Sequence, residues 1–173
     1  MVTSESDLKM LLKALAFAAQ KHRDQRRKDV ESSPYINHPI SLASILCNEG
    51  HVTDTDVICA ALLHDTVEDT DTTAEELEQE FSAAIRHIVM DVTDDKTLGK
   101  AERKQRQVDH AAHISDQAKL VKLADKISNL RDVAGSPPSG WSLQRRQEYF
   151  DWAKAVIVQP RGVLNGLQEA YSP

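Results

Sequence analysis

Histidines and carboxylates stand in three separate segments of this chain of 173 residues, and each segment has the pattern of a helix. They are His38, the adjacent pair His64 and Asp65, and Asp125. Neighbouring residues on one helix point about 100° apart, so the adjacent pair cannot complete a metal coordination sphere alone. We therefore expect packed helices to bring His38 and Asp125 to the pair, as a metal site in a helical bundle requires.

The ligand types indicate which metals are suitable. Two imidazole nitrogens and two carboxylate oxygens suit a borderline or hard divalent ion, so Mn²⁺, Fe²⁺ and Zn²⁺ all fit. The adjacent pair follows the apolar turn 60–63, and Glu68 and Asp69 come soon after it. These polar groups are costly to bury unpaired, and a bound cation would compensate for that cost. The pattern alone leaves Asp125 open, because it lies opposite the apolar stripe of its helix, where a solvated carboxylate is equally expected.

Basic residues form a second group. They precede the first expected ligand, occupy a middle loop and follow a proline-rich break: Lys21, Arg23, Arg26, Arg27, Lys28, Lys96, Lys100, Arg145 and Arg146. Such runs usually mark solvated faces. Beside a metal site they would instead hold a multiply phosphorylated small molecule, with arginine suited to bidentate phosphate contacts. Tyr35, Trp141 and Tyr149 could cover a base, with core packing as the equal alternative.

The composition predicts one globular domain spanning residues 1–173. The chain is 40% hydrophobic, which provides a core that needs neither disulfides nor a structural metal. Cys47 and Cys59 lack metal-site spacing and are expected to be core thiols in a reducing compartment. The apolar stretch 11–19 lacks the features of an export signal, and no run approaches the roughly 18–20 residues of a membrane span. We expect a cytoplasmic protein without a membrane partner. A net charge of −6 argues against nucleic-acid binding, and the oligomeric state is left open.

The expected fold class is an all-α bundle, because apolar residues recur at helical spacing almost throughout. Helices are predicted over 8–19, 39–50, 53–65, 73–89, 100–113, 116–133, 142–158 and 162–170. Pro39 is expected at the first position of its helix, with His38 at the N-cap and Gly50 ending the helix in a left-handed conformation. The buried stripe of the first helix is expected to comprise Leu8, Leu11, Leu12, Leu15 and Ala19. Surface or capping positions are expected for His22, His51, His87, His110 and His113.

Three ordered motifs carry a resemblance to a known family. They are His38-Pro39, the run 64–70 and the run 122–126. With these motifs the sequence resembles the HD-superfamily hydrolase domain of the RelA/SpoT alarmone enzymes. The likeness extends through 26–29, 34–37, 92–97, 140–142 and 148–150, so it covers nearly the whole chain. It is greatest to the metazoan SpoT homologue type, a stand-alone small alarmone hydrolase.

The resemblance implies roles for named residues. It implies one bound metal, typically Mn²⁺, with the ligands His38, His64, Asp65 and Asp125. Glu68 and Asp69 match an acidic pair that positions and activates the attacking water. Substrate contacts are implied for Arg27, Lys28, Asn129, Lys100, Arg145 and Tyr149. Ser128 stands where a larger histidine or tyrosine is common, which should widen the pocket beside Asn129.

The family reaction removes the 3′-diphosphate of (p)ppGpp, giving GDP or GTP plus pyrophosphate and ending a starvation signal. In this scheme a metal activates water, a carboxylate orients it or takes its proton, and cations offset the phosphate charge. A chain of 173 residues is not expected to hold the synthetase and regulatory domains of the long enzymes. Two alternatives stay open, namely removal of the 2′-phosphate of NADPH and a module that senses nucleotides without turnover. Glu68 and Asp69 argue against the second, because a sensor does not need a water-activating pair.

Overall fold

The computed structural model describes residues 4–158, and these residues form helices and loops without a strand. In chain order the elements are α1 (Glu5–Lys21), α2 (Asn37–Ser44), the π-helix η1 (Ile45–Glu49), α3 (Thr55–Leu63), α4 (Thr66–Asp69), α5 (Ala74–Glu80), α6 (Ala83–Val92), α7 (Lys100–His110), α8 (Asp116–Gly135) and α9 (Leu143–Val158). The all-α prediction is confirmed, while the helix expected over 162–170 lies outside the described residues. None of the helices in 4–158 is long and apolar enough to cross a membrane.

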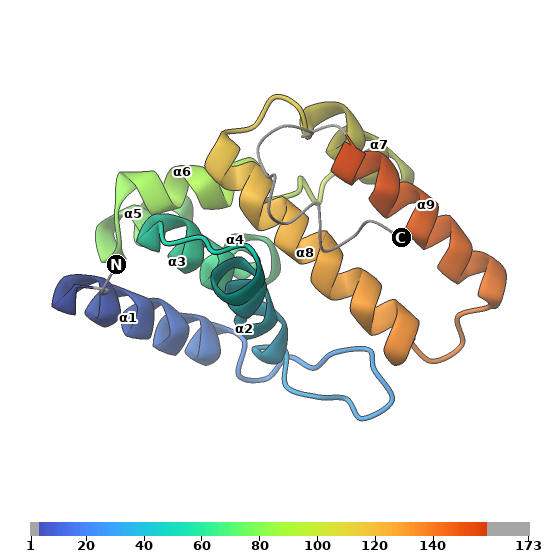
Figure 1. The fold of residues 1–173 in the computed structure, drawn as a ribbon, viewed down its shortest axis with the longest axis horizontal. Coiled ribbons are helices and arrows are strands. Elements are labelled where there is room, and N and C mark those ends of the chain that lie inside the picture. The colour runs from blue at the N-terminus through green and yellow to red at the C-terminus, as the bar shows by residue number, and fades with distance from the viewer. Residues whose placement is uncertain (1–3, 159–173) are drawn as a thin grey trace.

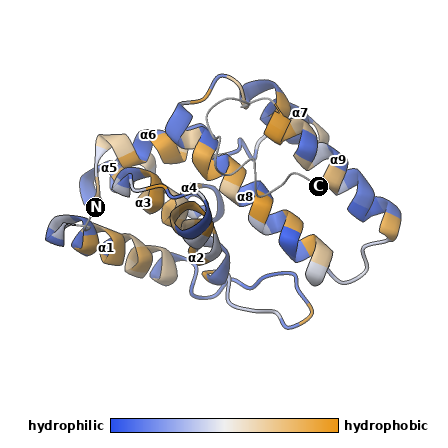
Figure 2. Ribbon diagram, in the orientation of Figure 1, coloured by the Kyte–Doolittle hydropathy of each residue, from blue (hydrophilic) through white to orange (hydrophobic). Residues whose placement is uncertain are grey.

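Helix α3 lies at the centre of the bundle. Every residue from Val57 to Leu63 is buried, as its uniformly apolar sequence predicts. Helices α1, α2, α6 and α8 all pack against α3 (Figure 1). Hydrophobic residues concentrate where these helices meet (Figure 2). The last residue of this rigid helix is immediately followed by His64 and Asp65, so the core fixes their position.

Helix α8 is the long element that joins the two sides of the molecule. It packs against α2, α3 and α6 on one side and against α9 on the other, and α9 in turn packs against α7 (Figure 1). Its 20 residues span about 30 Å at 1.5 Å per residue. Asp125 lies near the middle of α8, in the part of the helix that packs against α2 and α3.

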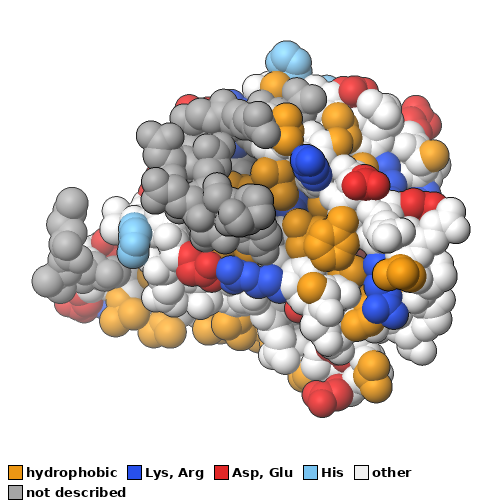
Figure 3. Space-filling model, turned by 45° about the vertical axis from the view of Figure 1, so that its right-hand side comes forward, with side chains coloured by type: hydrophobic (Ala, Val, Ile, Leu, Met, Phe, Trp, Pro, Cys, Tyr) orange, Lys and Arg blue, Asp and Glu red, His pale blue; other side chains and the backbone are white. Residues whose placement is uncertain are grey.

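The buried face of α1 differs from the predicted stripe. Ala14 and Ala18 are fully buried, whereas Leu8 and Leu12 are 53% and 57% exposed. Hydrophobic side chains follow the lower left edge of the molecule in Figure 3, where α1 lies in Figure 1. The stripe was predicted from the helical spacing of apolar residues. Leu11 and Leu15 do pack against the core, but the fully buried positions are the small residues Ala14 and Ala18, which allow the helices to approach closely.

The helix that carries His38 starts earlier and ends differently than predicted. It begins at Asn37, so His38 is its second residue rather than its cap, and Pro39 stands third. A proline is tolerated there because the first-turn N–H groups have no partner inside the helix. At the other end Gly50 has a φ of −81°, not a left-handed value, and its N–H donates to Ile45 O at 2.9 Å. The π-helix η1 ends the segment, and the positive φ falls on His51.

The predicted helix over 73–89 is two helices. It breaks at Phe81 and Ser82, and Ser82 starts α6 by accepting a hydrogen bond from Ile85 N at 3.1 Å. Thr73 caps α5 in the same way, by accepting from Glu76 N at 3.1 Å. Serine is a strong N-cap, so a new helix can start at Ser82 although the apolar spacing continues through the break.

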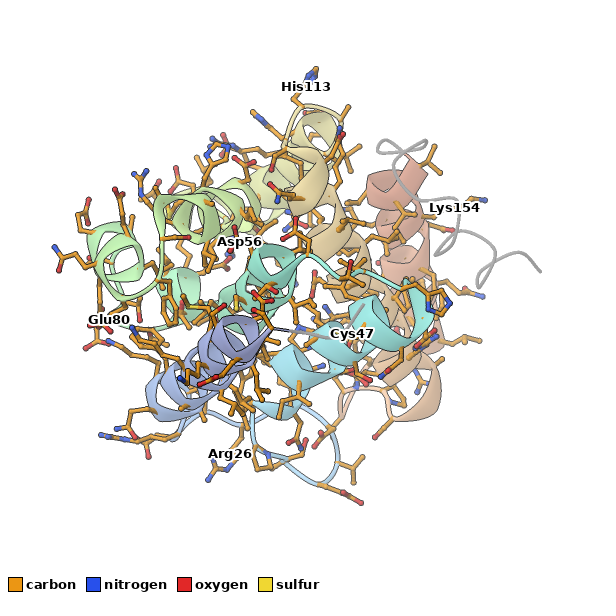
Figure 4. All side chains as sticks on the ribbon, turned by 60° about the vertical axis from the view of Figure 1, so that its left-hand side comes forward. Arg26, Cys47, Asp56, Glu80, His113 and Lys154 are labelled. Atoms are coloured by element: carbon orange, nitrogen blue, oxygen red, sulfur yellow. The ribbon has the colours of Figure 1, made fainter. Side chains whose placement is uncertain are left out.

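Two further residues depart from their expected surroundings. His22 was expected at the surface but is buried, with Nδ1 at 2.8 Å from Gln25 Oε1 and its ring against Tyr35. Cys47 was expected in the core but is exposed, while Cys59 is buried as predicted. His113 does lie at the surface, where it points away from the molecule (Figure 4).

Candidate metal centre

Three helical segments bring the expected ligands to one pocket. His38 comes from the first turn of α2, His64 and Asp65 from the link between α3 and α4, and Asp125 from α8. All four line a pocket of about 230 Å³. Ligand atoms of His38, His64 and Asp65 lie within 4.8 Å of one another, a spacing at which one ion could contact all three. The sequence could not show this proximity, because it depends on how the helices pack.

His64 is held with one nitrogen facing the pocket. Its Nδ1 donates to Ala61 O at 2.9 Å, one turn earlier in the chain. This bond leaves Nε2 on the pocket side, 2.9 Å from Asp65 Oδ2. A backbone carbonyl bound to the far nitrogen is the usual way in which a metal-binding imidazole is oriented.

His38 is oriented in a similar way by a hydroxyl. Its Nδ1 lies 3.2 Å from Ser128 Oγ, and its Nε2 lies 3.2 Å from Asp125 Oδ1. Ser128 is therefore a buried support behind His38, and the expected widening of the pocket beside Asn129 stays a prediction. Asp125 stands outside the set of three within 4.8 Å, so its role as a fourth ligand stays a prediction.

The charges of the cluster fit a divalent cation. Burial lowers the pKa of His38, which favours the neutral imidazole that binds metals. Burial opposes ionisation of Asp65 and Asp125, yet His64 beside the first and Lys126 beside the second hold both pKa values below the ordinary one. Burial also opposes a charged His64, but the Asp65 and Asp125 carboxylates raise its pKa to about 9. Two ionised carboxylates with two imidazoles attract positive charge, which a metal can supply in place of a proton.

Two residues at the cluster were not assigned to it from the sequence. Tyr35 donates its hydroxyl hydrogen bond to Asp65 Oδ2. Lys126 is buried, donates to Asp125 Oδ2 at 2.8 Å and lies 4.5 Å from the centre of the Trp152 ring. The sequence could have indicated Tyr35, because it stands three residues before His38 and a single turn brings the two residues together.

Glu68 and Asp69 are on the short helix α4, directly after the ligand pair. Both line the same pocket as the cluster. Glu68 Oε2 accepts a hydrogen bond from Asp94 N at 3.1 Å, and burial raises the pKa of this carboxyl. Asp69 forms an ion pair with Lys96. Within residues 4–158, Glu68 has no ion pair as short as that of Asp69 with Lys96 and is therefore the better placed of the two to accept a proton.

A second pocket of about 390 Å³ opens beside the first. The two share the wall residues Arg27, Tyr35, Asp69 and Asn129. The second pocket also has basic and aromatic walls, from Arg26, Lys28, Trp141 and Tyr149. Arg27 forms an ion pair with Asp132 and lies 3.4 Å from Asn129 Oδ1, and Asn129 donates to Asp125 Oδ1 at 2.6 Å. A chain of contacts thus joins the basic pocket to the metal cluster.

The remaining predicted substrate residues have different surroundings. The ring of Tyr149 packs at a tilt against that of Trp141, with 5.6 Å between the ring centres. Arg145 is exposed and lies over the Trp141 ring at 4.5 Å. Lys100 is exposed at the start of α7 and lines neither of these two pockets. Its contact with substrate, like those of Lys28 and Arg145, stays a prediction.

Comparisons with known proteins agree with this geometry. The family model described as HD domain matches residues 14–151. A guanosine-3′,5′-bis(diphosphate) 3′-pyrophosphohydrolase, MESH1 of Danio rerio, is 60% identical over 95% of this chain and 91% of its own length. MESH1 of Homo sapiens is 58% identical over 95% of this chain and 92% of its own length. A solved structure, described as a metazoan ortholog of SpoT that hydrolyses ppGpp and acts in starvation responses, matches with a TM-score of 0.91. It is 46% identical, over 98% of this chain and 93% of the other.

Proposed function

The chain belongs to the HD-domain family and, within it, to the MESH1 group, and from this membership we propose that it hydrolyses the 3′-diphosphate of ppGpp and pppGpp. The products are GDP or GTP, and pyrophosphate. The observation that carries the proposal is the cluster of His38, His64 and Asp65 in a pocket that also holds Glu68. We propose Mn²⁺ as the bound ion, with Asp125 as the fourth ligand.

The side chains of the pocket have separate tasks in the reaction. A divalent cation bound at the cluster would supply Lewis-acid polarisation of the water and of a phosphoryl oxygen. Glu68 takes the proton from the water, helped by a carboxyl pKa that burial raises. Water adds to the phosphorus that carries the ribose 3′-oxygen, that P–O bond breaks, and the proton ends on the ribose oxygen. Asp69, which is paired with Lys96, orients the water.

The adjoining basic pocket receives the rest of the nucleotide. Arg27 and Lys28 offset the charge of the 5′-phosphates, and the guanidinium of Arg27 can bind a phosphate with two hydrogen bonds. Trp141 and Tyr149 provide flat apolar faces on which a base can stack. Asn129 lies at the boundary of the two pockets, where the ribose must sit.

Product analysis tests this proposal. The purified protein is incubated with Mn²⁺ and either ppGpp or NADPH, and the products are separated by anion-exchange chromatography. We expect GDP and pyrophosphate from ppGpp, with loss of both products in the presence of a chelator and in the Asp65→Ala variant.

Other outcomes would replace the proposal. Phosphate release from NADPH without GDP from ppGpp would assign the pocket to dinucleotide metabolism, because both substrates present a ribose-linked phosphate to the cluster. Binding of ppGpp without any product would indicate a nucleotide sensor.

A further inference from the structure

A third cavity, of about 210 Å³, adjoins the metal pocket on the side away from the basic aromatic pocket. The cavity and the metal pocket share Asp94, Gln107 and Lys122 as wall residues. Helix α8 runs past all three spaces. Asn129 borders the metal pocket and the basic aromatic pocket, which is the second pocket described above. Lys122 lies about 10 Å earlier on the helix and borders the metal pocket and the third cavity. The metal cluster therefore lies between two spaces, one of which the nucleoside occupies in the proposed function.

Polar groups in the wall of this cavity lack partners. Lys122 is half-buried and has no hydrogen bond or ion pair among residues 4–158, and burial lowers its pKa. The Nε of Arg103 and the Oε1 of Gln107 are buried without a hydrogen-bond partner in the part of the chain that the structure describes. The other end of Arg103 lies 4.0 Å from Glu68 Oε1, at the edge of ion-pair range. Unpaired buried polar groups are costly and commonly mark a place where a ligand binds.

The acidic residues of the same wall are already engaged. Asp91 accepts from the N–H and the hydroxyl of Ser115 at 3.0 and 2.8 Å. Asp94 accepts from Gln107 Nε2, and Asp95 accepts from Thr97 N at 2.9 Å. The wall atoms without a partner among the described residues are thus two donors on cations, Lys122 Nζ and Arg103 Nε, and one acceptor, Gln107 Oε1. The two cationic donors suit an anion.

We propose that this cavity receives the diphosphate that leaves from the 3′-position, and that Lys122 and Arg103 bind its distal phosphate. The inference rests on the proposed function, and it gives the substrate a direction: the nucleoside lies toward Trp141 and the leaving group toward α7. A 3′-monophosphate would reach the metal cluster but not Lys122. The two side chains thus select a 3′-diphosphate over a 3′-monophosphate.

Binding of pyrophosphate itself tests the proposal without turnover. Equilibrium dialysis compares pyrophosphate and orthophosphate on the wild type, Lys122→Met and Lys119→Met, all at the same concentration of Mn²⁺. Lys119 is the matched control, because it lies one turn earlier on α8 and is paired with Asp116 at 2.8 Å. We expect Lys122→Met to weaken pyrophosphate binding about 10- to 100-fold, as loss of a charge-assisted hydrogen bond implies. Orthophosphate binding, and both ligands in the control, should change less than about twofold.

A second variant and a second substrate complete the test. Arg103→Met should weaken pyrophosphate in the same direction from the opposite wall. Each of the two cavity variants should also lose much of the preference for ppGpp over the analogue with a 3′-monophosphate. Unchanged pyrophosphate affinity in Lys122→Met and Arg103→Met would overturn the inference while leaving the hydrolase intact. Failure of the wild type to hydrolyse ppGpp would instead remove the proposed function.

Discussion

At the scale of single residues, hydrogen bonds behind the ligands prepare the cluster for a metal. Ala61 O fixes His64 and Ser128 fixes His38, so each ring presents Nε2 to the pocket. A carboxylate oxygen lies 2.9 Å from one of these nitrogens and 3.2 Å from the other. Acceptor groups this close require a proton or a cation between them.

The charge of Glu68 is the residue-scale feature most open to a test. The Glu68→Gln substitution keeps an oxygen to accept the hydrogen bond from Asp94 N but removes the base. We expect turnover of ppGpp to fall about 10²- to 10⁴-fold, the usual worth of a general base, with metal content unchanged. Steady-state kinetics with metal analysis on the same sample measures both.

The pH dependence of ppGpp turnover tests whether Glu68 acts as a general base or only as a structural carboxylate. Burial raises the pKa of Glu68 above its ordinary 4.5, so the active, deprotonated form is lost at a higher pH than for an exposed glutamate. With the metal site saturated, wild-type turnover should fall on acidification with a midpoint above 4.5. The residual rate of Glu68→Gln should lack this limb. If Glu68→Gln hydrolysed ppGpp at a rate near that of the wild type, Glu68 would be excluded as the base.

Residue types decided which parts of the site could be predicted. His38, His64, Asp65 and Asp125 are identifiable because imidazole and carboxylate groups beside apolar segments are costly to bury unless a cation or a partner compensates them. Tyr35 and Ser128 were not placed at the ligands, because hydroxyl groups occur throughout a chain and only packing shows which of them contact a histidine or a carboxylate. Lys122 belongs to the run 122–126 that carries the family resemblance, but lysines also occur throughout a chain, and only packing shows that this one borders a cavity.

At the scale of elements, the metal cluster depends on where α3 begins and ends. Asp54 caps its start by accepting from Asp56 N at 3.0 Å and Val57 N at 3.4 Å, and it also accepts from Gln117 Nε2 of α8 at 2.8 Å. The cap thus joins the central helix to the helix that carries Asp125.

Removal of this cap should destabilise the fold without harming the chemistry. We expect Asp54→Ala to lower the free energy of unfolding by about 1 kcal/mol and the melting temperature by about 2–4 °C. Thermal denaturation followed by circular dichroism measures the change, and turnover at about 25 °C should stay at the wild-type level. Asp24→Ala is the control, since within residues 4–158 this exposed carboxylate pairs only with Arg23 beside it, and its loss should cost less than about 0.5 kcal/mol. Equal melting temperatures for the two variants would contradict the assigned role.

The elements themselves were predictable where apolar periodicity is strong. The central helix α3 and the long helix α8 follow their patterns, and the start of α3 at Asp54 is visible as a cap. The break at Phe81 and Ser82 was missed because the apolar spacing continues through it. The π-helix η1, which packs against α8 and has Ile45 and Leu46 buried, was missed because one widened turn leaves no distinct apolar spacing in the sequence.

At the scale of the whole molecule, α8 organises the chemistry along one line. Asn129, Lys126, Asp125 and Lys122 occur in order along one face of this helix and border the aromatic pocket, the metal cluster and the third cavity in turn. An overall charge of −6 coexists with local positive charge along this line, which suits a small polyanionic substrate. Within the described residues, α1, α3, α6 and α8 share one hydrophobic core, and a single domain over residues 1–173 stays a prediction.

Hydrolysis of ppGpp is proposed to take place at a metal held by the cluster of His38, His64 and Asp65. The direct measurement is a titration of metal-free protein with Mn²⁺, in which bound metal and ppGpp turnover are recorded on the same samples of wild type, Asp65→Ala and the exposed control Asp71→Ala. We predict one ion per chain in wild type and control, turnover that rises in proportion to bound metal, and neither tight binding nor turnover in Asp65→Ala. Turnover that persists in Asp65→Ala, or that is complete before any metal is bound, would contradict the account.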